Sequence, residues 1–149
     1  MVSEKDIRIL EQLRRNSKST TQQISNATGI PVTTVHNRIR KMEEAGIIKG
    51  YGVSLDHKKL GYDILAFIMI SVSYISSDGK RISQDELARN ISEMPYVEEA
   101  HIVTGGVDII AKVRVQNMDV LNDFVINQLR NLNGVENTET VIVLKSLER

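Results

Sequence analysis

Apolar residues at helical spacing mark the start of the chain. Ile7, Leu10 and Leu13 recur every three residues and predict one buried face of a helix over roughly the first 15 positions. Ser3, followed three residues later by Asp6, resembles a capping box and favours a helix start at this point.

A second, shorter helix is predicted after a polar stretch. Thr20 suits its N-cap, and Ile24 and Ala27 would turn inward. Gly29 is well placed to end this helix in a left-handed conformation. Two short helices separated by a tight Gly-containing turn are typical of a helix-turn-helix, so a further helix is expected directly after Gly29.

That third helix is predicted over residues 31–45, from Pro31 at a first helical position to Gly46 as a C-terminal stop. Placed at about 100° per residue, its apolar residues form one stripe, which holds Val32, Val35, Ile39 and Met42. The opposite arc is polar, has no acidic residue before Glu43, and holds Thr33, Thr34, Asn37, Arg40 and Lys41, with His36 and Arg38 at its flanks.

The residue types of this arc suit double-stranded DNA. Asn can bond adenine edges, Arg and Lys can read guanine or hold phosphates, and Thr can contact a thymine methyl group. Recognition helices read bases mainly with their N-terminal part, so we expect Thr33, Thr34 and Asn37 to contact bases. The phosphate candidates are Arg38, Arg40 and Lys41, and Thr20, His36 and Lys49 complete the predicted DNA-binding set. The competing interpretation is a polar helix face that is merely solvated.

The segment after Gly46 predicts a small hairpin or strand that runs from Ile47 to Leu55 and would make the module winged. We therefore predict a winged helix-turn-helix domain at residues 1–50 and a polar linker at 51–62. His57 lies in that linker and is interpreted as an ordinary linker residue.

Residues 63–149 alternate between strand-like and helix-like patterns. We predict strands over 64–74, 97–103, 107–115 and 141–144, and helices over 85–94 and 118–132. Gly105 and Gly106 join the two middle strands tightly, which implies an antiparallel hairpin. The order β, α, β, β, α, β is the ferredoxin-like pattern, so the predicted fold class is α+β.

Two helices can cover only one face of this predicted sheet. The strands at 64–70 and 141–144 are apolar on both faces, and the chain has no third layer for the second face. A second copy of the sheet, related by a two-fold axis, is the simplest cover. A homodimer also suits the first module, because paired reading helices bind two half-sites.

Charge separates the two modules. The 149 residues carry nineteen basic and nineteen acidic side chains, which gives a formal net charge of zero. Residues 1–62 hold eleven basic and six acidic side chains, a net of +5, whereas residues 63–149 hold eight and thirteen, a net of −5. The average hides a basic module suited to nucleic acid and an acidic module that is free to pair with itself.

Composition removes several classes of site. No apolar run approaches the roughly 20 residues that cross a bilayer, and the polar start is unlike a leader, so we expect a cytoplasmic protein without a membrane partner. The absence of Cys excludes disulfides, thiolate nucleophiles and Cys-based metal centres. His36, His57 and His101 are too scattered for a spaced metal motif, although folding can still bring two together, and we expect no metal and no cofactor.

Several motifs coincide in one known family. Asp6–Leu13 matches the pattern D..IL..L, residues 30–48 (IPVTTVHNRIRKMEEAGII) match a recognition helix with its Arg-Ile pair, and Gly50-Tyr51 and Leu60-Gly61 lie at the expected linker spacings. The stretches PYVEEAHIVTGGVD and GVENTETVIVL match a regulation-of-amino-acid-metabolism (RAM) domain. Over essentially its whole length the sequence resembles the Lrp/AsnC (leucine-responsive, feast/famine) transcriptional regulators. The resemblance implies a dimer, often assembled into tetramers or octamers, that binds promoter DNA and responds to a small molecule, commonly an amino acid, at an interface between regulatory domains.

One motif departs from the family pattern. The usual Gly-Asp-Tyr-Asp is replaced here by Gly105-Gly106-Val107-Asp108, so an acid and an aromatic ring that help to frame an amino acid are missing. The "T.T" pattern is present and can donate hydroxyls near the same interface. The resemblance therefore implies six effector-binding candidates, which are Gly105, Gly106, Val107, Asp108, Thr138 and Thr140. In the alternative interpretation, the glycines form a plain hairpin turn that Asp108 caps.

Two other functions stay open on the sequence. Some relatives of this fold resemble sirohaem decarboxylases, for which His101 and Arg114 on neighbouring predicted strands are the only support. A lone strand His is more often a surface or core residue, so we expect no enzymatic activity. The other alternative is a partner protein that acts by mixed assembly with a second regulator.

Overall fold

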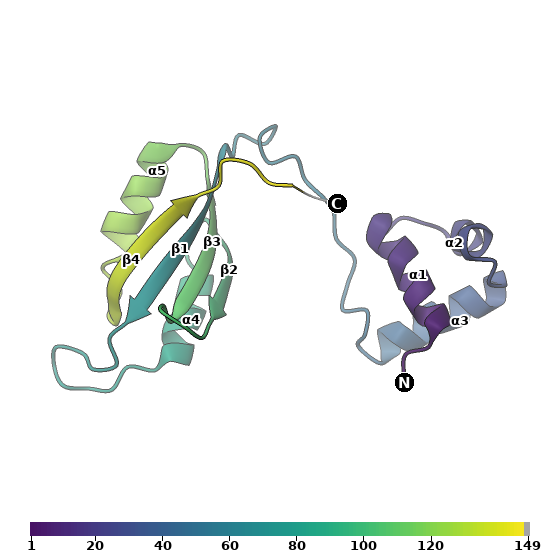
Figure 1. Cartoon of the computed structure of the whole chain (residues 1–149), viewed down its shortest axis with the longest axis horizontal. Coiled ribbons are helices and arrows are strands. Elements are labelled where there is room, and N and C mark those ends of the chain that lie inside the picture. Colours follow the sequence, from purple (N-terminus) through teal and green to yellow (C-terminus); the bar gives the residue numbers. More distant parts are fainter. Residues whose placement is uncertain (148–149) are drawn as a thin grey trace. The chain divides into compact units, whose positions relative to one another are not determined.

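The computed structural model describes residues 1–147 and contains two compact units that divide between Leu55 and Asp56. The first unit holds helices α1 (Glu4–Arg15), α2 (Thr21–Thr28) and α3 (Val32–Glu44) (Figure 1). The second holds β1 (Ile64–Val72), α4 (Gln84–Ser92), β2 (Val97–Ile102), β3 (Ile109–Val115), α5 (Met118–Asp123), the π-helix η1 (Phe124–Leu129) and β4 (Val135–Ile142). The predicted α+β class is confirmed; the domain limits at residues 50 and 63 stay predictions.

Capping side chains fix the first two helices as their sequences predict. The Ser3 hydroxyl accepts from the Asp6 N–H, and the Asp6 carboxylate accepts from the Ser3 N–H, which completes a capping box. Thr20 and Gln23 form the same reciprocal pair at α2. Gly29 adopts a φ of 69° and ends α2 in the left-handed region.

Helix α3 begins one residue later than predicted, because Pro31 is its N-cap rather than its first helical residue. At the other end, the Ile47 N–H donates to the Met42 carbonyl at 2.9 Å, and the Gly46 N–H donates to the Glu43 carbonyl at 3.0 Å. These two bonds form a Schellman motif around a left-handed Gly46, which confirms it as the helix stop.

The core of the first unit corrects two predicted inward positions. Its buried side chains are Ile9, Leu13, Ile24, Ile30, Val35 and Met42. Ile7 is 51 % exposed and Ala27 is exposed, so both predictions are wrong. The buried face of α1 runs through Asp6, Ile9 and Leu13, at i, i+3 and i+7, and Ile7 therefore lies beside it. In α2, Thr28 rather than Ala27 turns inward.

The predicted hairpin after α3 is wrong, because the described residues 47–55 form no strand. Side chains hold this extended segment: the Ser17 hydroxyl donates to the Gly52 carbonyl at 3.0 Å, and the Tyr51 hydroxyl donates to the Glu43 carboxylate at 2.6 Å. A strand needs a backbone partner as well as an alternating pattern, and no described residue of this unit supplies one.

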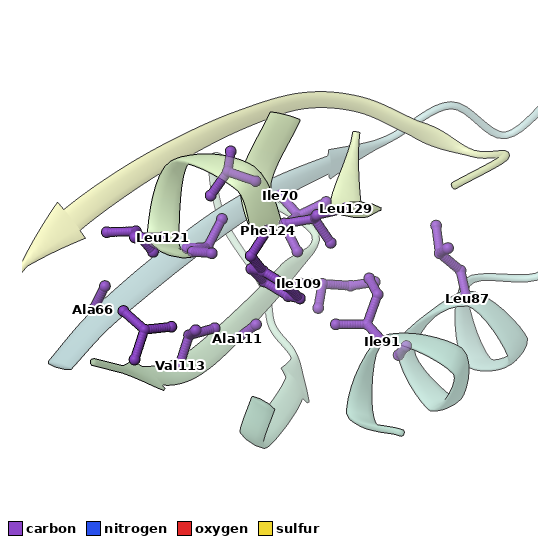
Figure 2. Close-up of a cluster of buried hydrophobic side chains, with 14 of the residues drawn as sticks. Ala66, Ile70, Leu87, Ile91, Ile109, Ala111, Val113, Leu121, Phe124 and Leu129 are labelled. Carbon is purple, nitrogen blue, oxygen red and sulfur yellow. The ribbon is translucent and has the colours of Figure 1, made fainter. Parts of the chain in front are cut away.

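The second unit is an antiparallel four-stranded sheet in the order β2-β3-β1-β4, which confirms the ferredoxin-like arrangement (Figure 1). Both helical segments cover the same face. Figure 2 shows the core between them, where Leu87 and Ile91 of α4, Leu121 of α5 and Phe124 and Leu129 of η1 meet Ala66, Ile70, Ile109, Ala111 and Val113 of the sheet.

Two elements of this unit differ from the predicted ranges by more than two residues, and the other four agree to within two residues at each end. The last strand covers residues 135–142 instead of 141–144, because its backbone pairs with β1 from Val72 to Ala66 at a sheet edge, where polar residues are tolerated. The helix predicted over 118–132 is a short α5 continued by the π-helix η1. Among residues 1–147, no helix is long and apolar enough to cross a membrane.

Candidate DNA-binding surface and effector site

Helix α3 presents most of the predicted DNA-binding arc to solvent. Thr33, His36, Asn37, Arg40 and Lys41 are exposed, whereas Thr34 and Arg38 are half-buried at the edges of the arc. Val35 and Met42 are buried beneath the helix. The buried stripe therefore fixes which side of α3 can meet a DNA groove.

The cations of the arc differ in how tightly the protein holds them. The Arg40 Nε lies 2.8 Å from the Glu44 Oε1, but the Arg40 side chain is 72 % exposed. Such an exposed i,i+4 pair contributes only about 0.3–0.5 kcal/mol, so Arg40 can exchange Glu44 for a phosphate. Lys41 and Lys49 have no ion-pair partner within residues 1–147.

Arg38 is engaged with the start of α1. Its Nη1 donates to the Asp6 Oδ1 at 2.9 Å and to the Ser3 Oγ at 2.7 Å. Burial of Asp6 opposes its ionisation, but the hydrogen bonds from Ser3 and the nearby Arg38 charge outweigh burial and lower the pKa of Asp6 to about 2. Arg38 thus bridges two helices, and its predicted phosphate contact stays a prediction.

The partnership of Arg38 with Ser3 and Asp6 was missed at the level of sequence. The sequence signal for this partnership is Asp6, which lies three residues before Ile9 on the buried face of α1. A carboxylate next to Ile9 and Leu13 requires a charged or hydrogen-bonded partner. Thr20 also has a structural partner, since its hydroxyl oxygen accepts from the Gln23 N–H, yet it is exposed and its own proton can still be donated.

The turn between β2 and β3 carries four of the six effector candidates. Gly105 has a φ of 118°, which favours glycine at this position. The Asp108 carboxylate accepts from the Val72 N–H and from the Tyr74 hydroxyl, each at 2.8 Å, and the Asp108 N–H donates to the Ile70 carbonyl at 3.0 Å. Asp108 therefore caps the end of β1, and its hydrogen bond raises the pKa of Tyr74.

The two threonines lie elsewhere in the sheet. Thr138 and Thr140 stand in β4, paired with Ile70 and Ile68 on the helix-covered face. Thr138 is buried and its Oγ1 accepts from the Arg130 Nε at 2.9 Å, whereas Thr140 is exposed. Within one chain β1 lies between β3 and β4, so the turn and the threonines lie on opposite sides of β1.

A cavity of about 430 Å³ lies close to the turn. It is lined by Tyr74 and by residues 81–85. Two contacts link it to Asp108, because the Tyr74 hydroxyl donates to the carboxylate and the Gln84 Nε2 lies 3.5 Å from the Asp108 carbonyl oxygen. Sequence reasoning missed Tyr74 and Gln84, which carry no motif of their own.

The residues of the enzyme alternative are engaged with carboxylates. The His101 Nε2 lies 2.9 Å from a Glu99 oxygen, and the Arg114 Nε donates to Glu98 at 2.6 Å. Within residues 1–147, no group of three or more acidic or His side chains gathers in a way that could hold a metal ion.

Comparison with known proteins places both units in one family. Residues 65–149 match the Lrp/AsnC ligand-binding domain, and residues 2–49 match a winged helix-turn-helix DNA-binding domain. The chain belongs to the Lrp/AsnC family. This Lrp/AsnC protein is a transcriptional regulator with a DNA-binding helix-turn-helix and a ligand-binding domain, and its relatives include proteins named as HTH-type transcriptional regulators and a leucine-responsive regulatory protein.

The family relationship extends over the whole chain. The HTH-type transcriptional regulator FL11 of Pyrococcus horikoshii is 36 % identical over 97 % of this chain and 91 % of its own length. The structure of AsnC from E. coli superposes with a TM-score of 0.85 at 30 % identity and covers 100 % of this chain and 97 % of its own. A regulator from Neisseria meningitidis, solved as an L-methionine complex, has the same fold, with a TM-score of 0.89 at 24 % identity over 100 % and 94 % of the two chains.

Proposed function

We propose that this regulator binds double-stranded DNA sequence-specifically as a homodimer, with α3 of each protomer in a major groove. The exposed, acid-free arc of α3 from Thr33 to Lys41 carries this proposal. Thr33, Thr34 and Asn37 read base edges, and Arg40 and Lys41 hold phosphates, with Thr20, His36 and Lys49 at the margins of the contact.

The uncovered face of the sheet supports the homodimer. Leu65, Phe67 and Met69 alternate with the buried residues of β1 and point away from the helices, and Val141 pairs with Phe67 on the same face. Phe67 is 36 % exposed and Val141 is 45 % exposed. An apolar patch of this kind on a regulatory domain is best buried against its two-fold copy, and further contacts would build tetramers or octamers.

The ligand-binding domain carries the effector part of the proposal. The methionine complex of the Neisseria regulator makes an amino acid the ligand class to test first. Gly105, Gly106, Val107 and Asp108 would contribute from one protomer and Thr138 and Thr140 from another, because β1 lies between the two groups within one chain. Calorimetric titration with the twenty amino acids tests this part, and an absence of heat with all twenty would reject it.

DNA binding is tested by fluorescence anisotropy over a range of salt concentrations. The probes are the best-bound duplex selected from a random pool with the wild-type protein and a scrambled duplex of equal composition. Arg40→Ala and Lys41→Ala should weaken binding to both probes and reduce the salt dependence of log K by about one ion per phosphate contact. Lys80→Ala in the second unit, whose ammonium group pairs with Asp78, is the matched control. Unchanged binding by both α3 variants would reject α3 as the reading helix.

A further inference from the structure

We propose that Arg38 positions α3 for DNA reading through its ion pair with Asp6, instead of holding a phosphate. The proposal rests on the proposed function, in which α3 is the reading helix. It assigns Asp6, which lies outside the arc, an indirect role in sequence recognition.

The geometry joins the middle of α3 to the first turn of α1. Asp6 accepts from the Ser3 N–H at 2.8 Å, the Ser3 hydroxyl at 2.7 Å and the Arg38 Nη1 at 2.9 Å. Arg38 also donates to the Ser3 hydroxyl oxygen, so the capping box of α1 and the guanidinium form one closed network. The side chains that cap the start of α1 therefore also bind the Arg38 side chain of α3.

Burial separates Arg38 from the other cations of the helix. Its side chain is 33 % exposed, against 72 % for the Arg40 side chain, and the Asp6 side chain is 11 % exposed. A largely buried carboxylate is costly without its cation, so the fold favours the pair over release of Arg38 to solvent or to a phosphate.

The Arg38–Asp6 pair also fixes the rotation of α3 about its axis, which apolar packing alone does not. Val35 and Met42 hold α3 against the core, but apolar contacts are non-directional and tolerate a small roll of a helix about its axis. A charge-assisted hydrogen bond has a preferred length and direction. Arg38 adjoins Asn37 in the sequence, so a roll that breaks the pair would also turn the Asn37 amide away from the base that it reads.

Replacement of Asp6 by Asn distinguishes a positioning role of Arg38 from a phosphate contact, because the two roles predict opposite changes in DNA affinity. If Arg38 holds a phosphate, Asp6→Asn removes a competing anion from its guanidinium, and DNA binding becomes tighter. If Arg38 positions α3, Asp6→Asn loosens the helix, and binding to the selected duplex weakens by about 3- to 30-fold, which lies within the range of coupling between members of one hydrogen-bonded network. Binding to the scrambled duplex changes less, because phosphate contacts dominate it.

Arg38→Lys is the second variant, and it keeps the charge while removing the planar fork. Positioning predicts that Arg38→Lys loses selectivity for the selected duplex and keeps the wild-type salt dependence. A phosphate contact predicts near wild-type binding, because lysine also holds phosphates. The double variant Asp6→Asn/Arg38→Lys should bind little worse than either single variant, because both remove the same link.

The experiment uses the full chain and the two duplexes defined above, at temperatures where circular dichroism shows each variant to be folded. Weaker, less selective binding with an unchanged salt dependence supports positioning; tighter or unchanged binding by Asp6→Asn overturns it. If Asp6→Asn does not fold, Arg38→Lys decides: selective wild-type binding overturns the proposal. Lys41→Ala, measured in parallel, separates failure of the positioning role from failure of α3 as the reading helix. If Lys41→Ala weakens DNA binding and Asp6→Asn does not, only the positioning role is rejected.

Discussion

The Asp108 carboxylate accepts a hydrogen bond from the Val72 backbone N–H at 2.8 Å and so ties the β2–β3 turn to the end of β1. We predict that Asp108→Ala lowers the free energy of unfolding by about 1.5–3 kcal/mol, because a hydrogen bond to a charged group is lost and a backbone N–H is left without its partner. Urea unfolding followed by circular dichroism measures the change.

Asp85→Ala, on the exposed first turn of α4, is the control for loss of an acid. Asp108→Ala should also remove the rise in the pKa of Tyr74, which a spectroscopic titration of tyrosine follows. An Asp108→Ala protein with wild-type stability would contradict the capping role and favour a carboxylate that serves the effector alone.

The uncovered sheet face leads to a prediction about assembly. A glutamate at Phe67 would place a charge at the centre of the proposed two-fold contact, so we expect Phe67→Glu to shift the protein to monomers at micromolar concentration. Sedimentation velocity measures this shift. DNA affinity should fall with it, because a monomer engages one half-site instead of two.

Met118→Glu is the matched control, since Met118 is an exposed apolar residue at the start of α5 on the opposite side of the sheet. It should leave the oligomeric state unchanged. A Phe67→Glu protein that sediments like the wild type would place the subunit contact on another surface.

Local signals explain which parts of the fold were predictable from sequence. The ends of α1, α2 and α3 follow from Ser3, Thr20, Gly29 and Gly46, because each cap depends on residues only a few positions away. The bounds of β4 and the state of residues 47–55 depend on backbone partners that a single segment does not encode. The apolar run at 141–144 therefore misplaced the last strand.

In the candidate site, too, some features follow from local sequence and others depend on tertiary structure. The exposure of Asn37, Arg40 and Lys41 follows from helical periodicity, which a sequence contains. The engagement of Arg38 by Asp6 depends on how α1 and α3 cross, and the separation of Thr138 from Asp108 depends on strand order. These relationships are tertiary. Periodicity could therefore only place Arg38 at the flank of the outward arc, and the family resemblance grouped the effector candidates without showing where they lie.

The low pKa of Asp6 gives a prediction about acid stability. Because the folded-state pKa of about 2 lies below the ordinary Asp value of 3.8, ionised Asp6 stabilises the fold fully above the unfolded pKa. This contribution is lost as the pH falls from about 4 through about 2. The difference in unfolding free energy between wild type and Asp6→Asn should therefore be constant from pH 5 to 7 and shrink below pH 4, as measured by urea unfolding at each pH. A difference that is independent of pH down to pH 2 would show that Asp6 is not held as a carboxylate.

Asn37 should control sequence preference at one position of the DNA site. Its exposed side chain lies one turn of α3 from Thr33, and an Asn amide can form a bidentate bond to adenine. We expect Asn37→Ala to cost about 1–3 kcal/mol at a single base pair and to leave the salt dependence of binding unchanged. Competition assays with duplexes that vary one base pair at a time measure this cost. Lys41→Ala gives the contrasting pattern, because loss of a phosphate contact weakens every duplex by a similar factor. A uniform loss for Asn37→Ala would make Asn37 a backbone contact and leave base reading to Thr33 and Thr34.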